Sequence, residues 1–396
     1  MYSYLPLGLR TLTKIENIVR NAMDHIGGQE VRMATLHPSE PWKQTGGWDN
    51  VDVLFKLQSR TEKEYALGQS EEEIVTPIAG EYSVSYKDLP VAIYQIGQKY
   101  RDELRAKSGI MRGREFGMKD MYSFHETQED FDRFYAIVKD AYLGIFERCG
   151  LVAKVTEASG GAFSEKLSYE FMVLTDAGED DILYCDACTH CANVEVATQK
   201  EGETCGKCSN GTLSIGKASE VGNVFDLGQK YPKALGYTFK DKEGKDQYPI
   251  MGCYGIGMTR LMGTIVETMA DEKGIVWPEW VTPFPFHVLS LGTNDAEVEA
   301  LADKVYEKLS SFTAKDGNVY PIERVLYDDR KVQTGEKRTD ADLIGIPYQI
   351  LVGKNALKES KLEVIERKTG KTTLLSLDEF FASEDAFQFV YDAVYG

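Results

Sequence analysis

The chain has 396 residues, a formal net charge of −18, and 42% hydrophobic and 11% aromatic residues. This composition excludes a disordered protein, and the length allows two or three domains that each bury a core. The acidic balance argues against broad, nonspecific nucleic-acid binding, but it does not exclude a local basic site. No apolar run approaches the ~18 residues of a membrane span, and the first residues lack the pattern of a signal peptide. We therefore expect a soluble, cytoplasmic protein.

The first part of the chain predicts helices packed on antiparallel strands. Apolar residues at helical spacing predict a helix over 8–26, which glycines 27–28 end, and a strand over 29–36. Residues 91–101 and 114–124 predict one long antiparallel hairpin. An amphipathic helix is expected over 127–148, with Ile137 and Ile145 in its buried stripe. A strand over 220–228 and a strand or turn that leads into a helix over 252–270 complete this part.

A proline-rich junction at 277–286 is the best candidate for a linker between two domains. We place a first domain at 1–280, with a cysteine-rich insert at about 184–216, and a second domain at 285–396. In the second domain, strands alternate with helices expected over 294–313, near 331–341 and over 377–394. This alternation predicts a compact α/β domain.

Five of the seven cysteines lie between positions 185 and 208. Cys185 and Cys188 form one C-x2-C pair, and Cys205 and Cys208 form a second pair sixteen residues later. This spacing is typical of a zinc ribbon, in which four thiolates hold a structural ion. Reduced, metal-free thiols are the alternative.

Residues 100–116 gather four arginines and a lysine in an otherwise acidic chain. On the predicted hairpin, Arg101 and Glu103 project from the same face of one strand. The intervening loop brings back Arg112, and Phe116 lies on the returning strand. Paired arginines can bind phosphate oxygens, and an aromatic face can stack on a base. The alternative is a surface ribbon with cross-strand ion pairs.

A glycine-rich stretch, "GCYGIGMTRL" at 252–261, places Arg260 near the start of a predicted helix. Glycines let the backbone approach a ligand closely, and a helix start favours an anion. The glycine spacing is not that of a dinucleotide-binding fold. A simple packing turn is the alternative.

Four segments together resemble the class II aminoacyl-tRNA synthetases in their prolyl form, in the order found in that family. Residues 100–125 resemble motif 2, residues 251–261 resemble motif 3, residues 3–38 resemble motif 1, and residues 325–347 resemble an anticodon-binding domain. The resemblance implies an α+β fold: an antiparallel-sheet catalytic domain flanked by helices, followed by a smaller α/β anticodon-binding domain.

The resemblance also implies a reaction and its partners. Proline and ATP, with Mg²⁺, would form prolyl-adenylate, and the prolyl group would pass to the 3′ end of tRNA(Pro). We expect a homodimer formed through motif 1, and neither DNA nor a membrane as a partner. Only about thirty residues lie where bacterial relatives carry a large editing domain, so no hydrolysis of mischarged alanyl-tRNA in cis is expected.

Motif positions carry the family's nucleotide contacts onto this chain. Arg101 and Arg260 would be the catalytic cations, with Arg101 at the α-phosphate and the amino-acid carboxylate. The resemblance assigns the other contacts as follows: Glu103 to the adenine amino group, Phe116 to stacking on adenine, Arg112 and Arg260 to the γ-phosphate, and Glu220 and Asn223 to ribose and to phosphate or Mg²⁺.

The expected proline pocket is where the sequence departs from the family. The family has Pro-Thr-x-Glu-Glu where this chain has "GQSEEE" at 68–73. Ser70 keeps a hydroxyl, and Glu72 keeps the carboxylate that would meet the ammonium of proline. Phe225 and Cys253 would line the apolar side, next to Arg101. A solvated helix start is the alternative for this glutamate run.

The resemblance places anticodon recognition in the second domain, where carboxylate and guanidinium groups suit the edges of splayed guanines. The candidates are Asp329, Arg330, Lys337, Arg338 and Asp342. A solvated polar loop is the alternative for this segment. For the whole chain, the alternatives are a class II synthetase for another amino acid, such as threonine, and a non-catalytic paralogue that binds tRNA.

Overall fold

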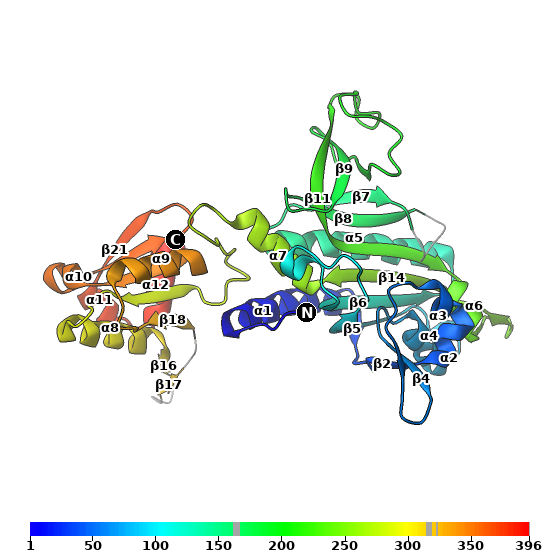
Figure 1. The fold of residues 1–396 in the computed structure, drawn as a ribbon, viewed down its shortest axis with the longest axis horizontal. Coiled ribbons are helices and arrows are strands. Elements are labelled where there is room, and N and C mark those ends of the chain that lie inside the picture. The colour runs from blue at the N-terminus through cyan, green and yellow to red at the C-terminus, as the bar shows by residue number, and fades with distance from the viewer. Residues whose placement is uncertain (161–166, 314–318, 322–323, 396) are drawn as a thin grey trace. The chain divides into compact units, whose positions relative to one another are not determined.

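The computed structural model describes residues 1–160, 167–313, 319–321 and 324–395, and the chain divides into two compact units (Figure 1). The first unit contains residues 1–5 and 15–268, and the second contains residues 6–14 and 269–396. Among the described residues, no helix combines the length and apolar character needed to cross a lipid bilayer.

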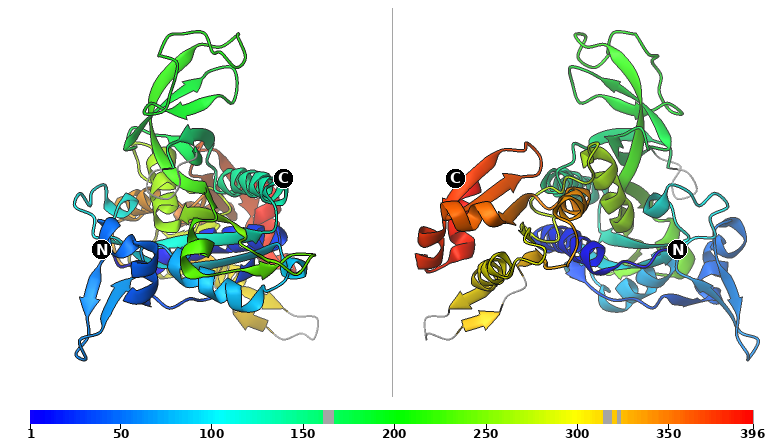
Figure 2. Two further views of the ribbon diagram at one scale, coloured as in Figure 1. Left: turned by 90° about the vertical axis from the view of Figure 1, so that its right-hand side faces the viewer. Right: turned by 60° about the vertical axis from the view of Figure 1, so that its left-hand side comes forward.

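A nine-stranded sheet forms the centre of the first unit (Figures 1 and 2). From edge to edge its strands are β1 (Gln29–Glu30), β5 (Val91–Tyr100), β6 (Glu115–His125), β14 (Ile250–Gly257), β11 (Leu213–Gly228), β8 (Ser168–Leu174), β7 (Lys154–Ala158), β10 (Cys191–Asn193) and β9 (Asp180–Cys185). The predicted hairpin is confirmed, because β5 pairs without interruption with residues 115–124 of β6. The pairing of β6 with β14 joins this hairpin to the glycine-rich stretch.

Helices cover both faces of this sheet. On one face, α5 (Gln128–Arg148) places the ring of Tyr135 6.0 Å from that of Tyr254. On the other face, α4 (Glu72–Tyr82) and α6 (Lys230–Leu235) pack on a core in which Val75 meets Tyr122 and Cys253. Successive residues of a strand point to opposite faces, so Cys253 faces α4 whereas its neighbour Tyr254 faces α5.

The predicted strand over 29–36 is wrong beyond its first residues. Pairing of β1 with β5 covers only Gln29 and Glu30. The backbone N–H of Met33 then donates to the Gln95 side chain at 3.0 Å, so this contact takes the place of a ladder bond. The other elements up to residue 269 are α1 (Pro6–His25), β2 (Leu36–Pro38), α2 (Ser39–Thr45), α3 (Gly47–Asn50), β3 (Lys56–Gln58), β4 (Glu64–Leu67), η1 (Tyr86–Asp88), η2 (Gly109–Met111), β12 (Phe239–Lys240), β13 (Asp246–Gln247) and α7 (Met258–Met269).

The second unit is built on a five-stranded sheet. Its strands, in spatial order, are β18 (Val325–Asp328), β15 (Phe286–Ser290), β19 (Tyr348–Val352), β20 (Lys361–Glu366) and β21 (Thr372–Ser376). The first three are parallel and the last two are antiparallel additions. The remaining elements are α8 (Ala296–Leu309), β16 (Ser311–Thr313), β17 (Val319–Pro321), α9 (Thr334–Ile344), α10 (Lys354–Glu359), α11 (Leu377–Ala382) and α12 (Ala386–Tyr395).

The helix expected over 377–394 is two helices, α11 and α12. The chain is extended at Ser383, with φ −64° and ψ 141°. The Asp385 carboxylate then accepts the backbone N–H groups of Phe387 and Gln388 at 3.0 and 3.1 Å, which starts a new helix. A side-chain cap of this kind satisfies the unpaired donors of a first turn.

The predicted stripe of α5 is confirmed at Ile145 but wrong at Ile137. The Ile145 side chain is 1% exposed, whereas Ile137 is 43% exposed. Both residues fit the helical period, so the period alone does not separate the centre of the stripe from its edge.

These two isoleucines provide a matched test of the core. We expect Ile145→Ala to lower the free energy of unfolding by about 2–5 kcal/mol, because it removes buried methylenes and leaves a cavity. Ile137→Ala should change it by less than about 1 kcal/mol. Chemical denaturation monitored by circular dichroism measures both, and equal losses would contradict the burial of this stripe.

Candidate functional site: an arginine-lined cavity beside a buried carboxylate

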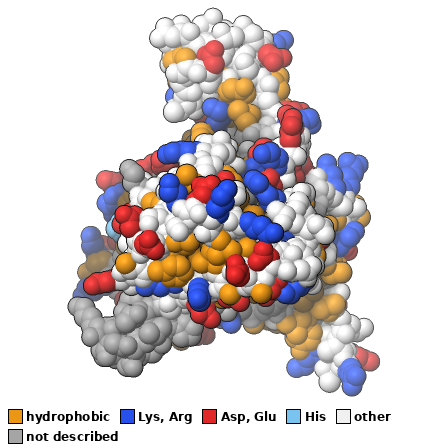
Figure 3. All heavy atoms as spheres, turned by 90° about the vertical axis from the view of Figure 1, so that its left-hand side faces the viewer, with side chains coloured by type: hydrophobic (Ala, Val, Ile, Leu, Met, Phe, Trp, Pro, Cys, Tyr) orange, Lys and Arg blue, Asp and Glu red, His pale blue; other side chains and the backbone are white. Residues whose placement is uncertain are grey.

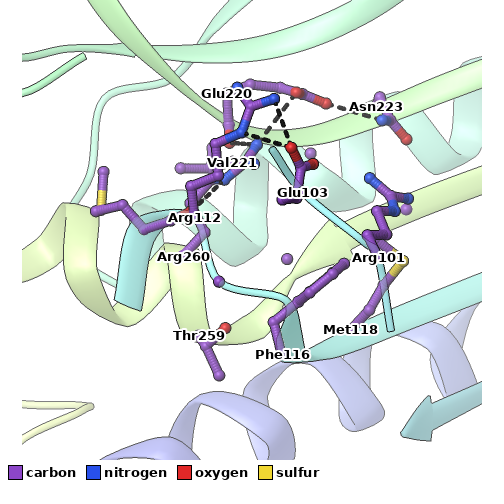
Figure 4. A pocket seen from close by; sticks show the side chains of 15 residues that line it. Arg101, Glu103, Arg112, Phe116, Met118, Glu220, Val221, Asn223, Thr259 and Arg260 are labelled. Carbon is purple, nitrogen blue, oxygen red and sulfur yellow. Dashed lines mark hydrogen bonds and ion pairs between the residues drawn. The ribbon is translucent and has the colours of Figure 1, made fainter. Parts of the chain in front are cut away.

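All seven residues predicted to contact the nucleotide line one cavity that opens to solvent, with about 580 Å³ of empty space when that open solvent is included (Figure 4). They come from the β5–β6 hairpin, from β11 and from α7, which are separate segments of the chain. The predicted members are Arg101, Glu103, Arg112, Phe116, Glu220, Asn223 and Arg260. Met111, Met118 and Thr259 also line the cavity and were not predicted.

Strand register explains why these side chains meet. Gly255 on β14 lies opposite Asn223 of β11, and Gly257 lies opposite Met118 of β6. The two glycines leave the floor between β6 and β11 open, because a Cβ at position 255 would lie only 2.8 Å from the Asn223 side-chain oxygen. A flat ligand can therefore approach the backbone here.

Carboxylates hold two of the arginines in place. Arg112 forms ion pairs with Glu103 at 2.9 Å and with Glu179 at 2.7 Å. Arg260 lies 3.2 Å from the Glu220 carboxylate and donates to the Met111 carbonyl at 2.9 Å (Figure 4). Glu179 was missed by the sequence reasoning, because it follows β8 in a turn far from either motif.

Arg101 has a different environment. Its guanidinium lies 5.3 Å from the centre of the Phe116 ring and donates to the Gln69 carbonyl at 3.4 Å. Within the described part of the chain, no carboxylate lies at ion-pair distance from it. Burial and the neighbouring Arg260 lower the pKa of Arg101 from its ordinary value. An anion bound beside Arg101 would relieve this electrostatic cost.

The predicted proline pocket lies on the same face of the sheet. Tyr122, Cys253 and Phe225 occupy directly opposite positions on β6, β14 and β11, so their side chains form one row. Above the row, the Cys253 thiol donates to one Glu72 oxygen at 3.2 Å. The other Glu72 oxygen is buried and has no hydrogen-bond partner among the described residues. The Ser70 hydroxyl lies 3.2 Å from that of Tyr122.

Burial keeps the hydroxyl and thiol of this row neutral. It raises the pKa of the Cys253 thiol and of the Tyr122 hydroxyl well above their ordinary values, and the Glu72 charge adds to both shifts. The pocket thus offers one carboxylate oxygen without a partner in an otherwise uncharged row, an arrangement that suits a small cation with an apolar body.

The solvated alternative for the "GQSEEE" run is wrong. Residues 69–73 are all buried, and none is more than 5% exposed. The Glu73 carboxylate accepts from the Thr45 hydroxyl at 2.8 Å, and burial together with the Glu72 charge raises the pKa of Glu73 to about 8. Glutamates at a helix start ordinarily face water, so the burial of this run indicates that it belongs to a binding site.

The four predicted zinc ligands converge on one point. The sulfur atoms of Cys185, Cys188, Cys205 and Cys208 all lie within 4.8 Å of one another. The Cys185–Cys208 and Cys188–Cys205 sulfur distances are both 3.7 Å. A tetrahedron with zinc–sulfur bonds of ~2.3 Å has sulfur–sulfur edges of about 3.8 Å, so the four thiols fit this ion. Cys191 lies outside the cluster, 3.1 Å from the Thr156 hydroxyl.

The second unit separates the five anticodon candidates. Asp329, Arg330 and Arg338 are exposed, although Arg330 pairs with acidic neighbours. Lys337 is buried, and its ammonium donates to the Ser290 carbonyl at 2.7 Å, so it supports the fold and does not face solvent. Asp342 is half-buried and accepts from a glutamine side chain at 2.9 Å. Acidic and basic side chains are interspersed on the face shown in Figure 3.

Comparison with known families assigns both parts of the chain. Residues 55–269 match the tRNA synthetase class II core domain (G, H, P, S and T), and residues 286–383 match an anticodon-binding domain. The chain is therefore a class II aminoacyl-tRNA synthetase in its domain composition.

Curated relatives of the chain identify one family within the class II synthetases. Proline–tRNA ligases from Halothermothrix orenii and Geobacillus kaustophilus are 31% and 33% identical, over 96% and 94% of this chain and 91% and 90% of theirs. A third, from Wolbachia sp. subsp. Drosophila simulans, is 37% identical over 96% of this chain and 89% of its own. The chain belongs to the prolyl-tRNA synthetase family.

A solved structure supports the fold. Giardia lamblia prolyl-tRNA synthetase in complex with prolyl-adenylate superposes with a TM-score of 0.74, covering 95% of this chain and 70% of that one. Sequence identity between the two is 18%, so the likeness concerns the fold alone.

Glu73 provides a test of the buried run. The pKa of Glu73 in the folded protein is above that of a glutamate in the unfolded chain, so the folded protein binds the proton more tightly. Proton binding therefore stabilises the folded state at low pH, and this contribution to the free energy of unfolding is lost as the pH rises toward 8. Relative to wild type, Glu73→Gln should gain stability between pH 5 and pH 8, by at most about 1.4 kcal/mol for each pH unit. Melting temperatures across this range measure the gain. The exposed Glu81→Gln on the same helix is the control, and a parallel response of both variants would contradict the burial.

Proposed function

We propose that this chain activates proline with ATP and transfers the prolyl group to tRNA(Pro). The observation that carries the proposal is the juxtaposition on one sheet face of a cavity lined by three arginines and a buried pocket with an unpartnered carboxylate oxygen. Membership in the prolyl-tRNA synthetase family supports the amino acid and argues against the threonyl alternative. The reaction needs ATP and tRNA, so we expect the protein to act in the cytoplasm.

The nucleotide cavity can hold a triphosphate if its arginines release their carboxylate partners and bind phosphate oxygens instead. Arg112 and Arg260 are already positioned by Glu103 and Glu220, and phosphate oxygens would replace those partners. Phe116 offers its ring to the base. Oxygen atoms of Glu220 and Asn223 face the same cavity and would hold Mg²⁺, which neutralises phosphate charge when bound.

Arg101 lies between the two halves of the site. It contacts Phe116 on the nucleotide side and the Gln69 carbonyl on the pocket side. In the proposed step, a proline carboxylate oxygen attacks the α-phosphorus, a new phosphorus–oxygen bond forms, and the bond to pyrophosphate breaks. Arg101 and Arg260 stabilise the negative charge that spreads over the phosphoryl oxygens. No side chain needs to move a proton in this step.

The row formed by Tyr122, Cys253 and Phe225 gives the proline ring an apolar wall. The free oxygen of Glu72 accepts from the secondary ammonium. In the second reaction a terminal hydroxyl of tRNA attacks the activated carbonyl, an ester bond forms, the bond from the carbonyl carbon to the phosphate oxygen breaks, AMP leaves, and the hydroxyl proton passes to the departing phosphate or to water. We assign this chemistry to a catalytic domain at 1–280 and anticodon reading to a domain at 285–396, through the exposed Asp329, Arg330 and Arg338, in a homodimer.

Differences in chain length support the absence of a cis-editing domain. The alignment with the Halothermothrix protein spans 528 positions, more than the 396 residues of this chain, so that relative carries inserted residues. The Wolbachia relative aligns over only 391 positions. We infer that this chain, with only the cysteine-rich arm between β8 and the active-site end of β11, does not hydrolyse alanyl-tRNA itself.

We also assign a zinc ion to the arm. Its four sulfur atoms have the spacing of a tetrahedral site, and the backbone N–H groups of Ala187 and His190 donate to Cys185 and Cys188 sulfurs at 3.4 Å. Such N–H contacts stabilise thiolate charge. The ion would brace the loop structurally, because four protein ligands leave no open position.

Proline-dependent exchange of pyrophosphate into ATP tests the proposed activity. We expect exchange with proline and none with threonine, and we expect Arg260→Ala to lower it by about 10²–10³-fold through loss of charge stabilisation. Arg114→Ala is the matched control: Arg114 is exposed on the same hairpin and outside the cavity, and exchange requires no tRNA. Exchange with another amino acid instead would refute the specificity, and none with any would favour a tRNA-binding paralogue.

Metal analysis tests whether the cysteine-rich arm binds zinc. Protein purified from zinc-containing medium should hold about one zinc per chain, and Cys205→Ser should lose it and melt at a lower temperature. Cys191→Ser should keep the metal, because Cys191 is outside the cluster. Absence of zinc in wild type, or its retention in Cys205→Ser, would show that the thiols are metal-free or that the ligand set differs.

A further inference from the structure

We propose that Glu71 is a positioning residue for proline binding, because its side chain ties the segment 69–72 to the strand that leads into Arg101. The inference rests on the proposed function, since it concerns the same pocket. The Glu71 carboxylate contacts His37 and Lys99, and Glu71 does not line the arginine-lined cavity, so its role would be exerted through Ser70 and Glu72.

A buried charge network surrounds the Glu71 carboxylate. One oxygen lies 2.7 Å from the Lys99 ammonium, and the other lies 2.9 Å from His37 Nε2. Lys99 also pairs with Asp120 at 3.0 Å. All four side chains are at most 2% exposed. Charges taken this far out of water persist only when each has a partner, so these groups depend on one another.

The same segment is attached to the hairpin at three consecutive residues. The Gln69 carbonyl accepts from Arg101 at 3.4 Å, and the Ser70 hydroxyl lies 3.2 Å from that of Tyr122. The backbone N–H of Glu71 donates to the same Tyr122 oxygen at 2.9 Å. Lys99 lies near the end of β5, and Arg101 is the first residue after it, so this end of the hairpin holds the segment at two points.

Glu72 follows directly as the first residue of α4, and one of its oxygens accepts from the Cys253 thiol, whereas the other is buried without a hydrogen-bond partner among the described residues. The position of that oxygen is set by the backbone immediately before it, which the Glu71–Lys99 pair fixes. Preorganisation of this kind lowers the cost of binding, and a loosened segment would bind proline more weakly.

Glu73 is a matched control within two residues. It is as buried as Glu71, at 3% against 2% exposed, but its carboxylate points to Thr45 on α2 and away from the hairpin. Burial alone would raise the pKa of Glu71, yet His37 and Lys99 outweigh it and hold that pKa below its ordinary value. Glu73 has a pKa of about 8, so most of it is protonated at pH 7. Substitution by glutamine therefore removes a negative charge at position 71, whereas at position 73 it replaces a protonated carboxyl group with another uncharged group.

The test compares these two substitutions in the full chain by pyrophosphate exchange at pH 7. We expect Glu71→Gln to raise the KM for proline at least tenfold while the KM for ATP changes less than about threefold, because a lost charged hydrogen bond corresponds to about one to two powers of ten. Glu73→Gln should leave both constants within about threefold of wild type. An unchanged KM for proline in Glu71→Gln, or equal effects of the two variants, would overturn the proposal.

Two further measurements separate positioning from folding. A residue that only stabilises the fold would lower the melting temperature without changing the KM of the folded fraction. If Glu71→Gln does not fold, Glu71→Asp keeps the charge but shortens its reach, and it should raise the KM for proline selectively; an unchanged value would again overturn the proposal. Wild-type protein without proline-dependent exchange would instead refute the proposed function.

Discussion

Antiparallel pairing of β6 with β14, and of β14 with β11, is the constraint on which the site depends. Because side chains alternate between faces, this register gives Tyr122, Cys253 and Phe225 to one face and their neighbours to the packing surface under α5. A slip of one residue would turn the whole row away from Glu72 and fill the cavity floor with residues that now pack against α5. The β5–β6 hairpin and the glycines of β14 therefore form the site only when they are paired in this register.

The exposure of the charged groups explains this site better than the net charge of the chain does. The net charge is −18, yet the three cavity arginines are gathered where carboxylates already hold two of them. A second, buried network of alternating sign lies next to the predicted proline pocket, around Glu71 and Lys99. The first network is partly exposed and can exchange partners with a ligand, whereas the second is sealed and can only support its surroundings.

Much of this site could be predicted from the sequence, because motif residues carry their spacing with them. Arg101, Arg112 and Arg260 were expected together and line one cavity. The roles of Glu179 and Lys99 could not be predicted, since each depends on a partner brought near only by folding. The burial of Glu71 and Glu73 contradicts their ordinary preference for water, and Lys337 is buried against expectation for the same reason: tertiary contacts outweigh residue preference.

Carboxylates paired with the cavity arginines have a consequence for the end of the reaction. Glu103, Glu179 and Glu220 pair with the same guanidinium groups that would bind a triphosphate in the proposed reaction. A weakly charged anion gains little by displacing them, so the site discriminates by charge before it discriminates by shape. In the proposed reaction, these carboxylates would be within reach to pair with their arginines again when pyrophosphate leaves. Acidic groups that oppose entry of the nucleotide would then assist the release of the product.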